Sequence, residues 1–264
     1  MVTNVEKYIS MGYRKFQLKV GANVTDDINR IRDVRKLLGI PLPLSLLFLL
    51  LLLLLLLLLL LLLLLLLDRK AIELNPDSPV SMPLMCDANT GWTQAEAMQV
   101  VNGVKDLTHT YIEQPCLTYD ECLSVRRHCP LPMILDECMD DIGVLCKIIS
   151  DKSADMINLK ISKVGGLTKA RAIRDLAVSS RLHLNIEDTW GGDIVTAAIT
   201  HLAQSTSPNF LFCSTDFNSY GPVSIADTSA KRKENTAVLS APTSPGLGVE
   251  IYPHVIGKPL FIAE

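Results

Sequence analysis

The stretch DMINLKIS, residues 155–162, decides the fold because its side chains alternate in character. Successive side chains of a strand point to opposite faces, so Leu159 and its neighbouring isoleucines share one face. Asn158 and Lys160 fall on the other face, where a buried lysine is costly without a polar partner. The helical stretch 167–180 follows after a glycine pair. Together they indicate one strand–helix unit of a parallel sheet.

The same unit recurs along most of the chain. The other strand-like stretches are RKFQLKV (14–20), PLMCDAN (83–89), TYIEQP (110–115), PMILDE (132–137), LHLNIED (182–188) and NFLFCSTD (209–216). Apolar residues at helical spacing predict further helices over 25–38, 93–107, 119–128, 140–150 and 192–205. The chain also opens with what reads as the last part of a helix. This alternation predicts a parallel α/β architecture.

The polar faces of these strands distinguish between two parallel architectures. An open doubly wound sheet buries both faces against helices and has no place for lysines and carboxylates there. A closed (β/α)8 barrel carries such groups at its inner, C-terminal mouth. No glycine-rich phosphate-binding motif follows the first strand. We therefore predict an α/β fold of the TIM-barrel type, with its first strand missing because only seven are visible.

Composition excludes several classes of protein. The 264 residues carry a formal net charge of -3, which offers no basic face for nucleic acid. The seven cysteines include no CxxC pair, so we predict reduced core thiols and no disulfide framework or zinc site. The N-terminus lacks the apolar core of a signal peptide. These features indicate a cytoplasmic enzyme.

Three carboxylates end three consecutive strands. Asp87, Glu113 and Asp136 are separated by about one strand–helix unit each, so neighbouring barrel strands bring them together. Converging carboxylates repel one another unless a cation lies between them, and hard oxygen ligands suit Mg²⁺, with Mn²⁺ as an alternative. Taken singly, each could instead cap the helix that follows it. The shared register favours a metal site.

Two lysines with inward parity flank this triplet in the sequence, Lys19 before it and Lys160 after it. A nearby divalent cation disfavours a charged amine, which makes a neutral lysine base more accessible. Two such lysines could remove a proton from carbon and return one on either face. The alternative is that both lie at the rim as ion-pair partners of the carboxylates. Lys163 has outward parity and is the weaker candidate.

Four motifs carry a specific resemblance: DANTGW (87–92), YIEQPC (111–116), ILDE (134–137) and NLKISKVGG (158–166). With them, residues 5–38 and 82–264 resemble the barrel domain of the enolase superfamily, in its mandelate racemase and muconate-lactonizing branch. The resemblance implies that Asp87, Glu113 and Asp136 hold Mg²⁺ and that Lys19 and Lys160 act as acid and base. It also implies a small amino-acid substrate and, for the complete protein, a homo-oligomer.

Within this branch, motifs such as FQLKVG (16–21), IEDTWGGDI (186–194) and TDFNSY (215–220) most resemble cis-3-hydroxy-L-proline dehydratases. They also resemble hydroxyproline and proline-betaine epimerases, and the catalytic residues do not decide between the lyase and the isomerase. Gln17 stands where many members have the first lysine of a KxK pair. The resemblance implies loss of an α-proton, followed by elimination of water or by return of a proton to the opposite face.

Further residues are expected around the substrate. Trp190 could meet a ring ammonium through a cation–π contact, with packing in its loop as the alternative. Asp216 could pair with the same ammonium, or cap a helix. Gln17 and Asn89 are further candidate substrate contacts. Residues expected to support the site indirectly are Glu187, Asp188 and Lys163. His183 is expected to be a satisfied interior residue.

Other features limit this interpretation. The resemblance implies an α+β capping domain before the barrel, and neither that domain nor the first strand is visible in the sequence. Without a lid the site would exclude water poorly. The chain is therefore interpreted as one barrel domain, residues 1–264, of a truncated enzyme. A membrane-associated, non-catalytic relative is the alternative from another class.

The leucine run at residues 46–67 is long enough to span a bilayer as a helix. It lies inside the predicted insertion 39–81, between a helix and the next strand of one barrel. A span there would place the two halves of the barrel on opposite sides of a membrane. The run also lacks interfacial aromatic residues. We therefore interpret it as a low-complexity expansion, and a membrane is not an expected partner.

Overall fold

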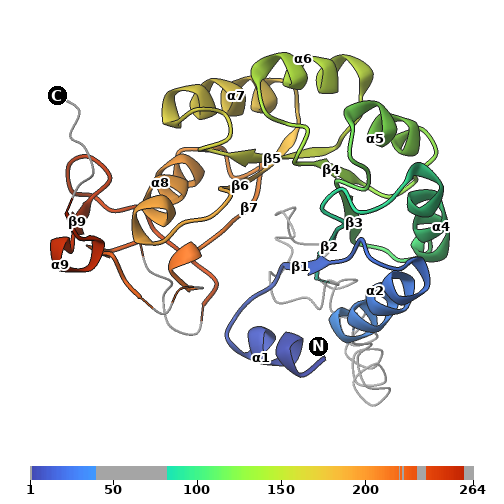
Figure 1. Cartoon of the computed structure of the whole chain (residues 1–264), viewed down its shortest axis with the longest axis horizontal. Helices are drawn as coiled ribbons and strands as arrows, with labels where there is room; N and C mark the ends of the chain where they lie inside the picture. The colour runs from blue at the N-terminus through green and yellow to red at the C-terminus, as the bar shows by residue number, and fades with distance from the viewer. Residues whose placement is uncertain (1, 40–81, 220, 222, 231–235, 259–264) are drawn as a thin grey trace, which may run out of the picture.

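The computed structural model describes residues 2–39, 82–219, 221, 223–230 and 236–258. Its main feature is a curled parallel sheet with helices on the outside (Figure 1). The strands are β1 (Phe16–Lys19), β2 (Leu84–Asp87), β3 (Thr110–Glu113), β4 (Met133–Leu135), β5 (Met156–Lys160), β6 (His183–Glu187) and β7 (Leu211–Ser214). They lie side by side in chain order. The prediction of a parallel α/β fold of the barrel type is confirmed.

Each strand is followed or preceded by a helix on the convex side of the sheet (Figure 1). These helices are α1 (Val2–Ser10), α2 (Val24–Leu38), α4 (Gln94–Val104), α5 (Tyr119–Arg126), α6 (Ile142–Asp151), α7 (Leu167–Ser179) and α8 (Asp193–Gln204). After β7 come the 3-10 helix η1 (Phe217–Ser219), the antiparallel pair β8 (Ala226–Thr228) and β9 (Val249–Ile251), and α9 (Pro253–Ile256).

Local sequence signals explain where two of the helices begin. At the start of α4, the Thr93 side chain accepts a hydrogen bond from the backbone N–H of Glu96, and the Glu96 carboxylate accepts one from the backbone N–H of Thr93. Thr118 and Glu121 form the same reciprocal capping box at the start of α5. Each box satisfies amide groups that a helix leaves unpaired at its N-terminus.

The core lies between the outer helices and the sheet. The largest fully buried side chains are Ile31, Leu84, Ile112, Met133, Ile134, Leu135, Met139, Leu145, Ile148, Ile157, Leu159 and Leu184. A smaller cluster of Met85, Ile134 and Met156 lies apart from the main core, with Tyr111, Phe212 and Cys213 packed against it. The inner face of the sheet is thus apolar before the C-terminal ends of the strands and polar at those ends.

Among the described residues, β1 and β7 are not paired with each other, and a cavity of about 750 Å³ lies between them. Side chains partly bridge this seam. The Lys15 ammonium donates a hydrogen bond to the carbonyl oxygen of Phe212 and lies 4.3 Å from the centre of its ring. Burial lowers the pKa of Lys15. A lysine at the seam thus provides a donor for an edge-strand carbonyl.

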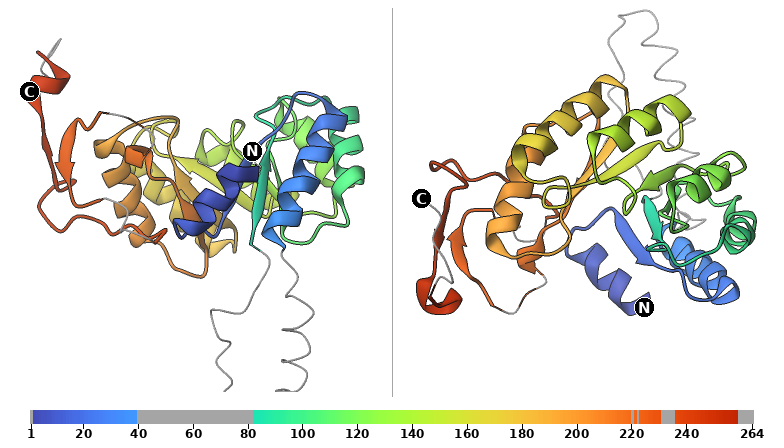
Figure 2. Two further views of the ribbon diagram at one scale, coloured as in Figure 1. Left: turned by 90° about the horizontal axis from the view of Figure 1, so that it is seen from below. Right: turned by 45° about the horizontal axis from the view of Figure 1, so that its top comes forward.

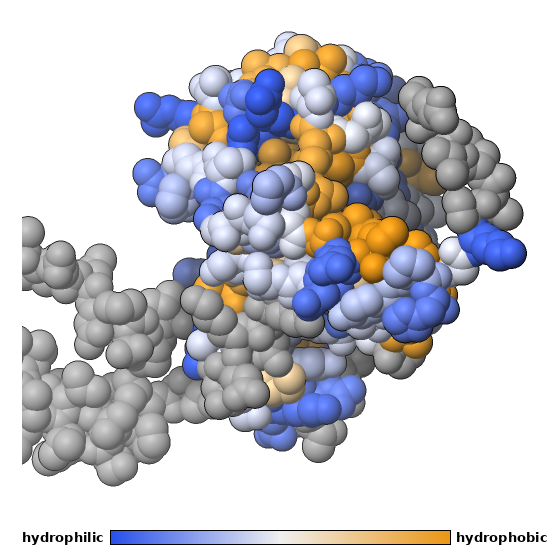
Figure 3. Space-filling view, turned by 90° about the vertical axis from the view of Figure 1, so that its left-hand side faces the viewer, coloured by the Kyte–Doolittle hydropathy of each residue, from blue (hydrophilic) through white to orange (hydrophobic). Residues whose placement is uncertain are grey.

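The antiparallel pair and α9 extend to one side of the barrel (Figure 2). The space-filling view of this side shows hydrophobic residues beside hydrophilic ones (Figure 3). Exposed apolar side chains on this unit are Ile251, Val255 and Ile256. Within the described part of the chain, no helix combines the length and apolar character that a bilayer span requires. Nearly all of the predicted insertion 39–81, including the leucine run, lies outside the described residues.

Two further expectations can be compared with the structure. All seven cysteines are free thiols, but the expectation of core thiols is wrong for Cys146, which is exposed on the outer helix α6. The expectation that His183 is an interior residue is wrong, because its side chain is exposed. His183 is the first residue of β6, where the strand enters the sheet and the barrel wall gives little cover. Its ring centre lies 5.8 Å from that of Phe210.

Candidate active site

The three predicted metal ligands lie together at the C-terminal ends of adjacent strands. Asp87 and Glu113 end β2 and β3 and are opposite one another in register. Asp136 follows β4 directly. At most 1% of each residue's surface is exposed. Buried carboxylates require compensation by cations or hydrogen-bond donors, so the surroundings of each one decide what the site can do.

The candidate cation site is formed by a group that differs in one member from the predicted triplet. In the described part of the chain, Glu113, Asp136 and Glu187 each offer an oxygen atom within 4.8 Å of the others. The Asp87 carboxylate instead pairs with the Lys19 ammonium and accepts a hydrogen bond of 2.8 Å from the backbone N–H of Asn89. Three close carboxylate oxygens are a donor set that fits a hard divalent cation such as Mg²⁺.

Lys19 and Lys160 each form an ion pair with one predicted ligand. Lys19 ends β1 and contacts Asp87, whereas Lys160 ends β5 and lies 2.6 Å from Asp136. Burial lowers the pKa of both lysines, but the neighbouring carboxylates outweigh it and raise the pKa above the ordinary value. Both amines are therefore protonated partners of the carboxylates.

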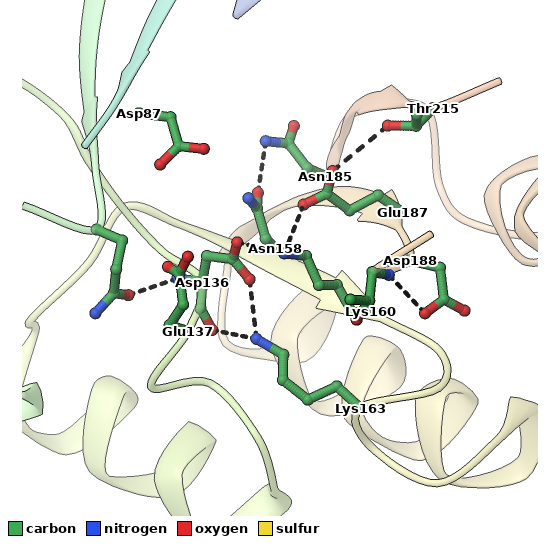
Figure 4. Close-up of polar contacts among 12 residues, drawn as sticks. Asp87, Asp136, Glu137, Asn158, Lys160, Lys163, Asn185, Glu187, Asp188 and Thr215 are labelled. Atoms are coloured by element: carbon green, nitrogen blue, oxygen red, sulfur yellow. Dashed lines mark hydrogen bonds and ion pairs between the residues drawn. The ribbon is translucent and has the colours of Figure 1, made fainter. Parts of the chain in front are cut away.

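Asp136 is held from several sides (Figure 4). Lys163 Nζ lies 2.9 Å from its carboxylate and donates to its backbone oxygen at 2.6 Å. The backbone N–H of Asp136 donates to Gln114 Oε1 at 2.9 Å. Lys163, expected to support the site indirectly, thus touches a predicted metal ligand. Gln114 is buried and was not predicted, because an amide inside a strand-end motif carries no distinctive sequence signal.

Glu113 is contacted by amide side chains from two other strands. Gln17 Nε2 on β1 donates to both carboxylate oxygens at 3.0 and 2.9 Å. Asn158 Nδ2 on β5 donates to Oε1. Burial, followed by repulsion from Asp87 and Glu187, raises the pKa of Glu113 well above its ordinary value. Gln17 was expected to contact substrate and instead lies against this carboxylate.

Glu187 lies opposite Lys160 in register, on β6. Its carboxylate is 3.9 Å from the Lys160 ammonium, and Thr215 Oγ1 donates to it at 3.5 Å (Figure 4). Burial and the nearby Asp136 charge raise the pKa of Glu187 to about 7. A nearby cation favours the ionised form of a buried carboxylate, so Glu187 could also supply a ligand oxygen.

Asp188 is turned away from the carboxylate cluster. It accepts hydrogen bonds from the backbone N–H groups of Ser162 and Thr189, and from the Ser162 hydroxyl. These contacts join the loop after β5 to the loop after β6. Asp188 therefore fixes the chain just beyond Lys160, which agrees with a supporting role.

The predicted substrate contacts lie at the strand ends but are not gathered into one group. Asn89 is exposed, and its amide donates to Glu137 at 3.0 Å. Trp190 is 68% exposed, and its ring centre lies 5.8 Å from that of Phe217 with the two planes tilted by 51°. Asp216 is buried at the start of η1, lines the seam cavity and accepts a hydrogen bond from the Ser219 hydroxyl.

Comparison with known proteins identifies this barrel. Residues 73–255, more than half of the chain, match the family described as enolase C-terminal domain-like. The chain belongs to this family. It thus shares the enolase C-terminal domain-like fold with its relatives, as the motifs at the strand ends indicated.

The curated relatives of this enolase-type domain include two enzymes of different reaction type. A cis-3-hydroxy-L-proline dehydratase from Roseibium aggregatum is 45% identical over 98% of this chain and 59% of its own length. An N-succinyl-L-Arg/Lys racemase from Bacillus cereus is 22% identical over 95% of this chain and 57% of its own. The chain thus spans somewhat more than half the length of these relatives.

Solved structures show the same domain. A mandelate racemase/muconate lactonizing enzyme from Roseovarius nubinhibens matches with a TM-score of 0.79 and 33% identity, over 99% of this chain and 59% of its own. A protein of the same type from that organism, complexed with magnesium, matches with a TM-score of 0.77 and 26% identity, over 98% and 61%. Both confirm the barrel fold of the enolase-type domain.

Besides Gln114, sequence reasoning missed Asp27, a residue that organises the strand ends. Asp27, fully buried on α2, accepts hydrogen bonds at 2.9 to 3.0 Å from the backbone N–H groups of Gly21 and Ala22 and from the Trp92 indole. These donors lie on the loops that follow Lys19 and Asp87. An acidic residue in the first turn of a helix is common because it interacts favourably with the helix dipole, so this position carries no sequence signal for such a role.

Proposed function

We propose that this chain forms the catalytic barrel of a metal-dependent enzyme that removes the α-proton of an amino-acid carboxylate and eliminates water. The proposed substrate is cis-3-hydroxy-L-proline. The observation that carries the proposal is the placement of Lys19 on β1 and Lys160 on β5, each in contact with a carboxylate of the same site. The dehydratase from Roseibium aggregatum, 45% identical to this chain, supports the choice of substrate.

Asp87, Glu113 and Asp136 are the proposed ligands of Mg²⁺, with Mn²⁺ as an alternative, and Glu187 is close enough to add an oxygen. The close approach of Glu113, Asp136 and Glu187 and the raised pKa of Glu113 fit a site that needs a cation. When bound, the cation would stabilise the negative charge that develops on the substrate carboxylate as the α-proton leaves.

The lysines are proposed as the acid and the base. When Asp87 and Asp136 are engaged elsewhere, Lys19 and Lys160 lose the pairing that raises their pKa. Burial, which lowers the pKa of each lysine, then favours a neutral amine that can accept a proton. The two lysines come from strands four positions apart in the sheet order, so they approach the carboxylates from different sides.

In the proposed reaction, one lysine amine accepts the proton from the α-carbon. The electron pair of that C–H bond forms a double bond to the neighbouring carbon, and the bond from this carbon to its hydroxyl breaks. The hydroxide leaves as water with a proton from the ammonium of the other lysine. The resulting cyclic enamine tautomerises to an imine, so that substrate is converted to imine plus one water.

Contacts to the substrate are part of the same proposal. Trp190 is exposed at the strand ends and offers an aromatic face to a ring ammonium. Asp216 lines the cavity and offers a carboxylate. Asn89 is exposed on the loop after β2 and offers an amide.

The two lysines also support a second function, the epimerisation of a proline-type or N-substituted amino acid. Without a leaving group, the lysine on the opposite face would return a proton to the α-carbon. The racemase from Bacillus cereus, 22% identical to this chain, favours keeping this alternative.

The experiment is proton NMR of cis-3-hydroxy-L-proline in D₂O with the purified full chain and Mg²⁺. Dehydration is expected to remove the α-proton signal and produce the cyclic imine, and a chelator is expected to stop it. Exchange of the α-proton without loss of substrate would instead support the epimerase. If neither dehydration nor exchange is observed, the enzymatic proposal is overturned and a non-catalytic relative is favoured.

A further inference from the structure

A row of polar side chains crosses three neighbouring strands inside the barrel. Asn158 on β5 is opposite Asn185 on β6, and Asn185 is opposite Cys213 on β7. The two asparagines lie two residues before Lys160 and Glu187 on the same strands, so they share the inner face with them. Figure 4 shows the asparagine side chains joined beside the carboxylate cluster.

All hydrogen bonds of this row point in one direction. Cys213 Sγ donates to Asn185 Oδ1 at 3.0 Å, and Asn185 Nδ2 donates to Asn158 Oδ1 at 2.7 Å. Asn158 Nδ2 then donates to Glu113 Oε1. Turning either amide over would aim an oxygen at another acceptor, because a carboxylate lies at the end of the row. The thiol at one end and the carboxylate at the other therefore fix both amides.

Burial makes each hydrogen bond of this row costly to lose. Asn158 and Glu113 are fully buried and Asn185 is 4% exposed, so water cannot easily replace a missing partner. Burial also raises the pKa of Cys213 to about 12, which keeps its S–H available as a donor at neutral pH. Asn185 Nδ2 has a second, weaker acceptor in Met85 Sδ at 3.3 Å.

We propose that this row is a positioning device that orients the Glu113 carboxylate for a divalent cation. Asn158 is the positioning residue in direct contact with Glu113, and Asn185 and Cys213 hold the Asn158 amide in its donating orientation. Gln17 donates to the same carboxylate from β1, so Glu113 is held between amides of two strands. This inference rests on the proposed metal-binding role of Glu113.

The expected effect is on metal affinity. Partners that orient a metal ligand typically change affinity by about 10- to 100-fold when they are removed. Asn158→Leu removes the donor to Glu113 at similar volume, so Mg²⁺ should bind at least about tenfold more weakly. Cys213→Ala removes only the terminal donor and should weaken binding less. Cys213→Ser keeps a donor and should restore affinity close to that of the wild type.

The experiment is calorimetric titration of Mg²⁺ into the purified, chelator-treated full chain and these variants. Cys129→Ala is the matched control, because this buried thiol donates to the Leu131 carbonyl oxygen outside the row. Its Mg²⁺ affinity should equal that of the wild type. Thermal unfolding without metal verifies that each variant folds. If Asn158→Leu does not fold, the comparison of Cys213→Ala with Cys213→Ser, which differ by one hydroxyl, decides the question.

The outcomes separate this inference from the proposed function. A wild-type chain that binds Mg²⁺ together with unchanged affinity in Asn158→Leu and Cys213→Ala would overturn only the positioning role. Equal weakening in Cys213→Ala and Cys213→Ser would also overturn it, because the restored donor would then have no effect. A folded wild-type chain that binds no Mg²⁺ would overturn the proposed metal site, and the inference with it.

Discussion

Lys160 on β5 and Asp136 after β4 form an ion pair, with 2.6 Å between Nζ and Oδ2. The same relationship recurs where Lys19 on β1 contacts Asp87 on β2. Each proposed base is thus paired with a proposed metal ligand. The pairs compensate buried charge, and they would have to separate before either lysine could accept a proton.

Replacing either lysine should remove proton transfer on one face of the substrate. Lys160→Ala and Lys19→Ala should each lower the rate of dehydration or α-proton exchange by about 100-fold or more, the usual contribution of a positioned acid or base. Proton NMR in D₂O measures both rates. Lys105→Ala is the control, because Lys105 is exposed at the end of α4. Full activity in both active-site variants would show that the lysines are not the catalytic pair.

The raised pKa of Glu187 predicts that the metal-free protein loses stability as pH rises. The pKa is about 7 in the folded protein against an ordinary 4.5, so the folded state binds the proton more tightly. This contribution is complete below pH 4.5 and is lost as pH rises through 7, which amounts to roughly 3 kcal/mol at most. Urea unfolding at pH 5 and pH 8 measures it.

Glu187→Gln should flatten this pH dependence, because the amide does not titrate. Part of the slope should remain, since the pKa of Glu113 is raised in the same direction. Glu96→Gln is the control, because Glu96 lies on the outer helix α4 and its pKa is lowered by hydrogen bonds from Thr93. An unchanged slope in Glu187→Gln would mean that Glu187 is not buried as a carboxylic acid.

The sequence predicted the strands and their inward residues because alternation along a strand fixes which side chains share a face. Lys160 was assigned to the inner face, and Glu187, which was expected to support the site, lies opposite it in register. Alternation does not fix the direction of the side chain beyond the β-carbon. The sequence therefore could not show that Asp87 turns toward Lys19 while Glu187 approaches Glu113 and Asp136.

Other features lacked a local signal altogether. β8 and β9 have three residues each and are distant in sequence, so alternation could not reveal their pairing. The contact of Gln17 with Glu113 joins β1 to β3, which are not neighbours in the sheet, and it depends on the curvature of the barrel. Such contacts follow from the assembled fold and cannot be deduced from any single segment.

Asp27 should be a major determinant of stability at the strand ends. Asp27→Ala would leave two backbone N–H groups and the Trp92 indole without their acceptor, at a cost of roughly 3 kcal/mol. Urea unfolding measures the loss. Asp26→Ala is the matched control, because Asp26 is the adjacent, exposed carboxylate of the same helical turn. A loss no larger than that of the control would show that water satisfies these donors.

Gly21, in the loop after β1, should not tolerate a side chain for two separate reasons. Its φ is +100°, and a β-carbon there would overlap the carbonyl oxygen of Ala88. Gly166 separates the two effects, because its φ is +107° and a β-carbon would meet no atom within 4 Å. Gly166→Ala should cost about 1 to 3 kcal/mol for backbone strain alone. Gly21→Ala should cost about 2 kcal/mol more, because the overlap forces the loops after β1 and β2 apart. These loops follow Lys19 and Asp87, so Gly21→Ala should also weaken Mg²⁺ binding, whereas equal effects of the two substitutions would show that the loops separate without cost.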